Sequence, residues 1–515
     1  MKMKNITKYI FAAFVSTSLF ASCNLELLPT TAIVYDENEP AIQSSDDIVS
    51  IYFGILAQYR SLCSGSFDIT TDVMVDYFNA TKGFGNNYGP VHRLDDSYTP
   101  SDDYVESFWA SNYSAIKNYN VAIEQAAKVT DPELQPAAKY LAAVAHFCRA
   151  SSYLTLTRLF GSVYDPATAE EELSVPLVKK YDVNYSPVRA TVQDVYDFIC
   201  EDLVYAEDIA VYDADIYNYL PSSQANLLPL TIDAVNAVWA RYYLDVKDYA
   251  QAVTYATKVI DTGYYKLAAS ASDMQKEYTN DNGTEPIVQM FANYNEGTIS
   301  KSIYTAVGYD EDNGKYFSPY FLPSQNLIDA YEPGDLRLST WFSQTMYPVY
   351  MNGTFHDEIY TFVKYLGNPE FNMSAIENGA HTAKPIMISE MYLIAAEAAY
   401  MQNNAVSVAS TKHLQAIQKA RKATTTQGTL ENIKNEWFKE MVGTGHRFVC
   451  LKRWGDPIGK RNIQPAALSN EVCHTGAAYD QREVPAGHYM FNFPIPSYEI
   501  KITPSLGQND GYEIK

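Results

Sequence analysis

Residues 232–260 read IDAVNAVWARYYLDVKDYAQAVTYATKVI, and this stretch decides the fold. Apolar side chains recur at helical spacing in both of its halves, before and after the four-residue segment Asp245-Val246-Lys247-Asp248. Two apolar stripes joined by a short polar turn predict an antiparallel pair of helices.

Helical periodicity also covers much of the remaining chain. A second hairpin is predicted over residues 386–420, with its turn at Asn403-Asn404. Further helices are predicted over the ranges 105–127, 133–160 and 191–211. The protein is therefore expected to be mostly α-helical.

The hairpin at 232–260 resembles a tetratricopeptide unit. Ala240 and Ala252 supply small residues where the two helices approach closely, and Tyr243 and Tyr249 supply bulky ones. No strict period of about 34 residues holds, so we expect a diverged set of hairpins that forms a curved scaffold. The concave face of such a scaffold usually binds another protein.

Long stretches between the helical blocks lack helical period. The first of them is rich in Gly, Asn, Asp and Tyr, and the second resembles it. Long irregular segments in a compact chain are usually functional loops. We interpret four such stretches as irregular excursions that together form a ligand-facing side: residues 64–104, 266–322, 343–383 and 456–492.

The N-terminus has the features of an export signal. Three lysines within the first eight residues precede an apolar run that is too short to span a bilayer and ends in Phe20-Ala21-Ser22-Cys23. We interpret residues 1–22 as a signal peptide. The cysteine at its end resembles that of a bacterial lipobox, so we expect Cys23 to be lipidated and residues 23–48 to form a flexible tether. An ordinary cleaved signal with a chance cysteine is the alternative.

Composition excludes some partners. The net charge is −23, and removing residues 1–22, which hold three lysines and no acid, makes it −26. So acidic a chain lacks the basic surface that binds nucleic acid or anionic lipid headgroups. Its 43 tyrosines suit half-exposed faces that contact sugars or proteins, although most of them are expected to pack between helices. The six cysteines include no CxxC pair and do not indicate a disulfide framework.

No catalytic motif stands out. The run from Gly83 to Gly89 has GxGxxxG spacing and opens no predicted helix, which argues against a dinucleotide site. Asp310-Glu311-Asp312-Asn313-Gly314 has part of a calcium-loop pattern but lacks the third acid and the distal glutamate, so a solvated turn is favoured and no metal or cofactor is expected. Asp72 and Asp76, one helical turn apart if this stretch is helical, are weak candidates for a glycosidase pair.

Seven motifs in order along the chain resemble those of SusD/RagB-type outer-membrane lipoproteins. The later matches, from Pro323 onward, are the more specific. The last two of them are Gly443 to Gly455, with Gly445-His446-Arg447-Phe448 and Lys452-Arg453-Trp454, and Pro494 to Tyr512, with Pro494-Ile495-Pro496 and Gln508-Asn509. The other five begin at Leu28, Trp109, Arg149, Pro323 and Glu390, and a further match at Arg189-Ala190-Thr191 falls between the third and the fourth of these positions.

The chain departs from the family pattern at four positions. Thr444 stands where a glutamate is usual, Trp437 where an arginine is usual, and Met387 and Gln418 where basic residues are common. These positions are interpreted as structural, so they leave the expected fold unchanged.

The resemblance implies a fold, a location and a role. It implies one SusD-like α-helical domain over residues 49–515, built on tetratricopeptide-like hairpins and displayed at the cell surface on a lipid anchor in the outer membrane. It implies no catalysis. Such proteins hold an oligosaccharide over a SusC-like TonB-dependent transporter and deliver it. An oligopeptide ligand, as in the RagB branch, and a scaffold without its own ligand are the alternatives.

In the family, the loop before the first signature helix and the irregular region before the Pro323 motif contribute to ligand binding. Sugar sites combine exposed aromatic rings with amide, carboxylate and guanidinium groups. The Arg447 and Trp454 motif is left out as structural. The candidate ligand-binding residues are Asp72, Asp76, Asn86, Asn87, Tyr88, Arg93, Tyr294, Tyr304, Tyr309 and Tyr316.

Overall fold

The computed structural model describes most of the chain, namely residues 41–180, 182, 184–212, 230–292, 299–300, 302–372, 374–464 and 469–513. The expected signal peptide, Cys23, most of the expected tether and Tyr294 lie outside the described residues.

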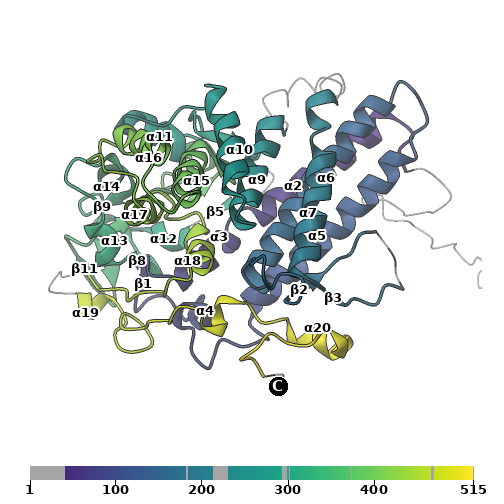
Figure 1. Ribbon diagram of the computed structural model, residues 1–515. Coiled ribbons are helices and arrows are strands. Elements are labelled where there is room, and N and C mark those ends of the chain that lie inside the picture. Colours follow the sequence, from purple (N-terminus) through teal and green to yellow (C-terminus); the bar gives the residue numbers. More distant parts are fainter. Residues whose placement is uncertain are drawn as a thin grey trace, which may run out of the picture.

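The first long helices of the chain lie together on one side of the molecule, and the other side combines later helices, long and short, with most of the small strands (Figure 1). The long helices are α2 (Ser45–Leu62), α5 (Asp103–Ala127), α6 (Gln135–Phe160), α7 (Val192–Ala206), α9 (Ile232–Asp245), α10 (Tyr249–Asp261), α15 (Ile388–Met401), α16 (Val408–Ala420) and α17 (Leu430–Glu440). The shorter helices are α3 (Ser66–Met74), α4 (Gly89–Arg93), α11 (Ala271–Tyr278), α12 (Ser302–Thr305), α13 (Gln325–Asp329), α14 (Leu336–Trp341), α18 (His446–Trp454), α19 (Ser469–Val472) and α20 (Ser497–Ile502).

The predicted hairpin at 232–260 is confirmed as α9 and α10. Asp248 caps α10 by accepting a hydrogen bond from the backbone N–H of Gln251 at 3.1 Å. Ala240 and Ala252 are fully buried, as the close approach of two helices requires. The ring of Trp239 stacks on Tyr243, with centroids 5.2 Å apart.

The other predicted helices are also present. The hairpin over 386–420 forms α15 and α16, and the helices α5, α6 and α7 correspond to the three further predicted ranges. The helices pack in sequence, α5 on α6, α6 on α7, α9 on α10 and α10 on α15. The prediction of a mostly helical scaffold of hairpins is therefore confirmed.

The tether was expected to reach residue 48, but α2 begins at Ser45. Ser44 and Asp47 form a reciprocal capping box, in which the Ser44 hydroxyl accepts from the Asp47 N–H and the Asp47 carboxylate accepts from the Ser44 N–H. Ile42 and Ile48 are buried in the core. A capped start with buried apolar residues makes this segment part of the folded scaffold.

The four stretches predicted to be irregular contain regular structure. The first holds α3, β1 and α4, so the glycine-rich run does lead into a short helix, contrary to expectation. The strands were missed because most are only two to four residues long, which leaves little alternation to detect. They are β1 (Phe78–Ala80), β2 (Leu173–Pro176), β3 (Arg189–Thr191), β4 (Pro286–Val288), β5 (Ile299–Ser300), β6 (Val307–Asp310), β7 (Gly314–Phe317), β8 (Phe321–Pro323), β9 (Phe342–Ser343), β10 (Val349–Met351), β11 (Thr354–His356), β12 (Thr361–Phe362), β13 (Ala380–His381) and β14 (Ile386–Met387).

Two of the sheets position the candidate site. Strand β1 pairs antiparallel with β8 in the register Phe78↔Pro323, which brings the first irregular stretch against the second. A four-stranded sheet has the order β11-β10-β7-β6. A small hydrophobic core that includes Phe317, Leu322 and Val349 lies against this sheet.

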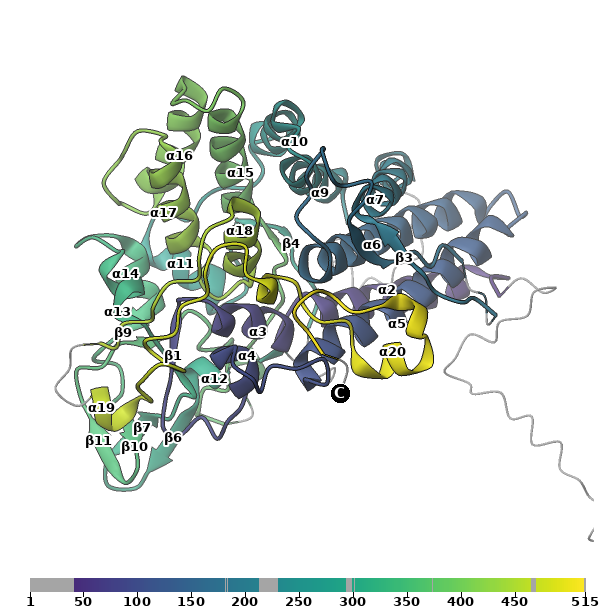
Figure 2. The ribbon, with the colours of Figure 1, turned by 60° about the horizontal axis from the view of Figure 1, so that its bottom comes forward.

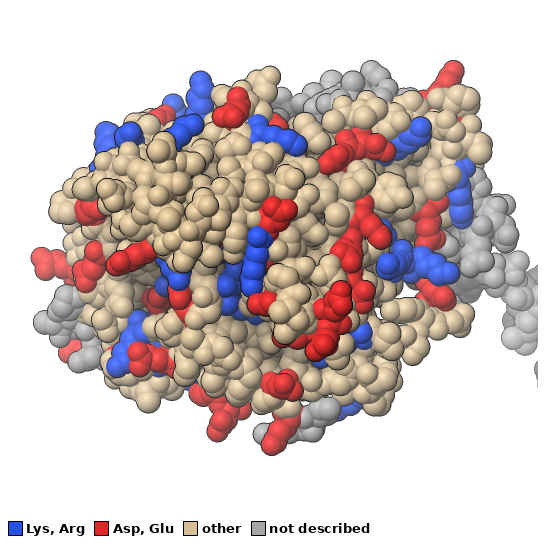
Figure 3. All heavy atoms as spheres, viewed as in Figure 1, with Lys and Arg blue, Asp and Glu red and all other residues tan. Residues whose placement is uncertain are grey.

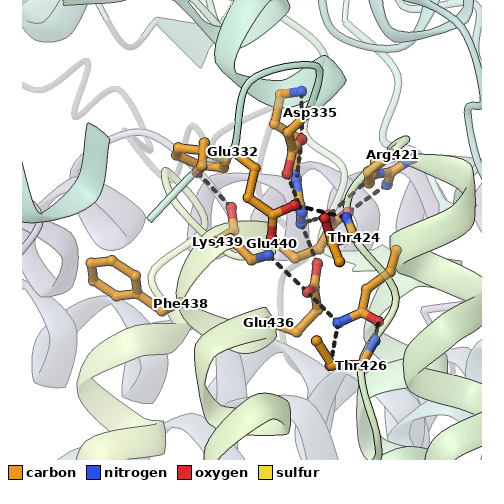
Figure 4. A network of polar contacts seen from close by, with 12 residues as sticks. Glu332, Asp335, Arg421, Thr424, Thr426, Glu436, Phe438, Lys439 and Glu440 are labelled. Carbon is orange, nitrogen blue, oxygen red and sulfur yellow. Dashed lines mark hydrogen bonds and ion pairs between the residues drawn. The ribbon is translucent and has the colours of Figure 1, made fainter. Parts of the chain in front are cut away.

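A buried ionic cluster fastens α14 to α16 and α17. The guanidinium of Arg337 contacts carboxylates of Asp335, Glu436 and Glu440 at 2.8, 2.6 and 2.9 Å, and all four side chains are at most 1% exposed. Arg421, next to Arg337, pairs with Glu440 and with Glu285. Figure 4 labels Asp335, Arg421, Glu436 and Glu440 of this cluster, and Glu440 is the labelled carboxylate that contacts Arg421. Because each buried charge has partners of opposite sign, the cluster is satisfied internally.

The C-terminal segment crosses back over the first helices. Helix α20 lies beside α5 (Figure 2), and the Ser497 N–H donates to the Pro100 carbonyl at 2.9 Å. The indole N–H of Trp109 donates to Glu499 at 3.2 Å. The Asn509 amide donates to the carbonyls of Phe160 and Phe493, both at 2.7 Å. Segments from the two ends of the described chain therefore pack against each other.

Candidate ligand-binding face

An exposed loop carries the polar residues that the sequence singled out. It leaves the core at Thr81, whose N–H donates to the Tyr320 carbonyl at 2.9 Å, and the N–H of Lys82 donates to the Val472 carbonyl at 2.7 Å. Asn86 and Asn87 are exposed at the loop tip, and Asn86 adopts a left-handed conformation with φ of 61°. Asparagine tolerates this conformation better than most residues.

The side chain of Arg93 is held in place by this loop. Its Nη1 donates to Asn86 at 2.7 Å, its Nε to Asp95 at 2.9 Å and its Nη2 to Ser97 at 3.0 Å. Partial burial opposes ionisation of Asp95, but hydrogen bonds from Ser97 and the Arg93 guanidinium hold the pKa of Asp95 below its usual value. A guanidinium has five N–H donors, and these contacts occupy three of them.

Aromatic rings flank the loop on two sides. Tyr88 stacks on Tyr104 with centroids 4.1 Å apart, and Tyr104 is the more exposed ring of the pair. His474 stacks on Tyr479 at 4.8 Å, and both rings are half-buried. Burial, with smaller contributions from Lys82 and Arg93, lowers the pKa of His474, so its ring is neutral at neutral pH. We define the Arg93 face as Asn86, Asn87, Arg93, Asp95, Ser97, Tyr104, His474 and Tyr479.

The four-stranded sheet carries a second aromatic group. The ring of Tyr316 lies 5.0 Å from Tyr350 and 5.7 Å from Phe355, and all three are half-buried. Because side chains alternate across a strand, these rings lie on the face opposite Phe317 and Val349, away from the small core. We call these three residues the Tyr316 cluster. Tyr309, which is 59% exposed, is one position from Gly308 and so points to the other face.

A glycine makes room for this cluster. Gly308 pairs with Tyr316 in the register of β6 and β7. A Cβ atom on Gly308 would lie 2.3 Å from the Tyr316 ring. The ring therefore lies across the Gly308 backbone, which only a residue without a side chain permits.

Two predicted ligand residues are buried instead. Tyr304 is 0% exposed and stacks on Phe78 at 4.6 Å, so the expectation that it contacts ligand is wrong. Tyr88 is only 9% exposed and is the inner ring of its stacked pair, and burial raises its pKa. Both were proposed because loops carry functional tyrosines, but these two pack under their own loops.

The two aspartates also have structural contacts. Asp72 is 0% exposed and accepts the Gly445 N–H at 3.1 Å. Asp76 follows the end of α3 and pairs with Arg447 at 2.9 Å, so the two aspartates do not share a helix. A paired carboxylate beside a buried one does not have the arrangement of an acid and a base flanking a substrate.

Sequence analysis missed five of the aromatic residues. Tyr350 and Phe355 flank an Asn352-Gly353 turn with positive φ at both positions, and Asn-Gly between alternating apolar residues is a strong hairpin signal. Tyr104 lies at the start of α5. His474 and Tyr479 carry no local signal, because only the β-bridge between Thr81 and Cys473 brings their segment to the loop.

The Asp310 turn, which has part of a calcium-loop pattern, is a simple turn in the structure. Among the described residues no group of three His, Cys, Asp or Glu side chains could hold a metal ion. Asp310 accepts hydrogen bonds from the N–H groups of Asp312 and Asn313, so it closes the β6–β7 turn.

None of the described helices is long and apolar enough to cross a membrane. On the face drawn in Figure 3, acidic and basic side chains are mixed.

Two family models match the chain, and between them they span most of it. One, described as starch-binding associating with outer membrane, matches residues 35–230, and the model of the SusD family matches residues 263–512. The chain belongs to the SusD family. A SusD-like protein P2 of Formosa agariphila is 31% identical over 169 residues, which are 32% of this chain and 29% of that relative.

Solved SusD family structures have the same fold. A SusD superfamily protein from Bacteroides thetaiotaomicron is 22% identical with a TM-score of 0.69, and the match covers 90% of this chain and 99% of that one. Surface glycan-binding protein A from Bacteroides fluxus is 20% identical with a TM-score of 0.67, covering 91% of this chain and 100% of that one. The family assignment made from motifs is therefore confirmed.

Proposed function

We propose that this SusD family protein is a non-catalytic, lipid-anchored protein of the outer-membrane surface that binds an oligosaccharide and delivers it to a SusC-like TonB-dependent transporter. The family descriptions and the glycan-binding relative from Bacteroides fluxus support a carbohydrate ligand. The expected lipid on Cys23 would supply the membrane attachment.

The arrangement of Arg93 carries this proposal. Its guanidinium is fixed by Asn86, Asp95 and Ser97. Half-exposed rings of Tyr104 and Tyr479 stand on either side of the loop. Flat rings next to oriented polar groups suit a sugar, which has apolar C–H faces and hydroxyls at its edge.

Binding at such a face is expected to be weak. Each hydrogen bond contributes about 1 kcal/mol net, and dissociation constants from about the micromolar to the millimolar range follow from a few such contacts. Weak binding fits a protein that passes its ligand on. The Tyr316 cluster offers a further surface for a long glycan.

The test is calorimetric titration of the protein lacking residues 1–23 with a panel of plant, host and microbial glycans and with peptide mixtures. We expect Arg93→Ala and Tyr104→Ala each to weaken glycan binding by about five- to fiftyfold, because each removes one main contact. Tyr264→Ala is the matched control, since Tyr264 is 79% exposed and lies just after α10.

Three outcomes would contradict the proposal. Binding of peptides without glycans would assign the protein an oligopeptide ligand. Glycan binding that survives both variants would place the site elsewhere. No binding by a folded protein would favour a scaffold role.

A further inference from the structure

A cavity of about 200 Å³ lies between the long helices and the part of the chain with small sheets. Its wall includes residues of α3, α6, α9, α15, α17 and α18 and of the segment 381–385. A cavity of about 150 Å³ holds one benzene molecule, so this one has room for a single ring-sized molecule such as one sugar unit. No residue of the Arg93 face or of the Tyr316 cluster belongs to this wall.

The wall combines aromatic surface with polar groups. Phe67, Phe108, Tyr278, Tyr365 and Trp437 supply rings. The polar residues Thr71, Thr444, His381 and His446 also line it. This mixture suits a small molecule with both C–H and hydroxyl surface.

One buried donor in this wall lacks an acceptor. Trp437 is 3% exposed, and within the described part of the chain its Nε1–H has no hydrogen-bond partner. Leaving a buried N–H unpaired costs about 1–3 kcal/mol, so such groups usually face water or a ligand. A molecule in the cavity that accepted this N–H would remove the cost.

The charged residues of the wall favour a neutral molecule. Arg241 makes a two-pronged contact with Glu390 at 2.7 and 2.6 Å, and Arg158 pairs with Asp245 at 2.6 Å. Arg453 pairs with Glu397, and Lys384 with Asp281. A charged ligand would have to compete with one of these pairs, whereas a hydroxyl can share the remaining lone pairs of the carboxylates.

Several positions that depart from the expected family pattern line the cavity. Met387, Trp437 and Thr444, three of the four positions that depart from the family pattern, all line it. The cavity lies apart from the Arg93 face, since no residue of that face lines it.

We propose that this cavity is a second binding site, which takes one neutral monosaccharide or a polyol of the same size with a hydroxyl accepting the Trp437 N–H. This inference is independent of which oligosaccharide, if any, binds the Arg93 face.

The experiment titrates the protein lacking residues 1–23 with neutral hexoses, pentoses, N-acetylhexosamines and hexitols, each up to about 50 mM, followed by calorimetry and tryptophan fluorescence. Trp437→Phe keeps the ring and removes the donor, and we expect it to weaken binding at least about fivefold. Tyr264→Ala, the exposed control used above, should leave monosaccharide binding unchanged, and Arg93→Ala reports whether the sugar binds the Arg93 face instead. Crystals of the unaltered protein soaked in the bound sugar should show it in the cavity.

The results that would overturn this site differ from those that concern the exposed face. Failure of every monosaccharide and polyol to bind would overturn it, whatever the oligosaccharide titrations give. Binding lost in Arg93→Ala but kept in Trp437→Phe would assign the sugar to the Arg93 face. If Trp437→Phe fails to fold, the soaked crystal of the unaltered protein still decides, because a sugar found outside the cavity would overturn the proposed site.

Discussion

At the scale of single residues, Glu277 shows how burial changes an acid. Its side chain is fully buried, and its carboxylate accepts the Glu285 N–H at 3.1 Å. Burial, and then the nearby charge of Glu285, raise the pKa of Glu277 to about 7. An unfolded chain would release this proton near the ordinary glutamate value of about 4.3.

We therefore expect stability to fall as pH rises through this interval. Between about pH 4.3 and 7 the folded state binds more protons at Glu277 than the unfolded state, so the free energy of unfolding decreases with pH and then levels off. Glu277→Gln should be more stable than the unaltered protein at about pH 8, by about 1–3 kcal/mol, and no more stable near pH 4.5. Urea denaturation at both pH values measures this. An equal difference in stability at the two pH values would contradict the raised pKa of Glu277.

The polar candidate residues were easier to predict from the sequence than the aromatic ones. Asn86, Asn87 and Arg93 were predicted, and they are exposed or held at the surface because short polar side chains in a glycine-rich loop have few other places to go. Tyr88 and Tyr304 were predicted on the same grounds and are buried. A tyrosine suits both a core and a surface, so its type alone does not decide between them.

At the scale of elements, the β6–β7 hairpin depends on Gly308. Gly308→Val would place a side chain within the Tyr316 ring. We expect a loss of about 1–3 kcal/mol of stability, because the ring must leave its position over the strand. In a Tyr316→Ala background the same substitution should cost much less, since the clashing ring is absent. Thermal denaturation of the two single variants and the double variant measures the coupling, and additive losses would show that the ring is not the cause.

Helical hairpins were predictable and the sheets were not, for a physical reason. A helix such as α10 repeats its apolar face over several turns, so the pattern is visible in thirteen residues. Strands such as β9 and β12 have two residues each and exist because chain segments far apart pair with one another. Strands β10 and β11 had a local signal, the Asn352-Gly353 turn.

At the scale of the whole molecule, the buried ionic cluster joins segments that lie about a hundred positions apart. Arg337 reaches both Glu436 and Glu440 across the interior. Although burial opposes ionisation of Glu440, Arg421 and Arg337 lower its pKa to about 2. The stabilisation it provides is present above about pH 4.3 and is lost as the pH falls toward 2.

Arg337→Met should destabilise the protein by about 3–5 kcal/mol at neutral pH, because it leaves three buried carboxylates with one cation fewer. Lys276→Met is the matched control. Lys276 pairs with Asp273 at 3.9 Å on the surface, and its loss should change stability by less than about 1 kcal/mol. Urea denaturation distinguishes the two, and similar small effects would mean that the cluster contributes little.

The crossing of the C-terminal segment over α5 and α6 also has a consequence for biogenesis. A ribosome makes Pro100, Trp109 and Phe160 several hundred residues before Ser497, Glu499 and Asn509, which are their partners. Chains are made from the N-terminus at about 5–20 residues per second, so the first helices wait tens of seconds for these contacts. During that interval, the surfaces of α5 and α6 that the C-terminal segment later covers are exposed, and a holding chaperone can bind them. A chain that stops before residue 493 lacks all of these contacts, so it would keep the covered surfaces of α5 and α6 exposed.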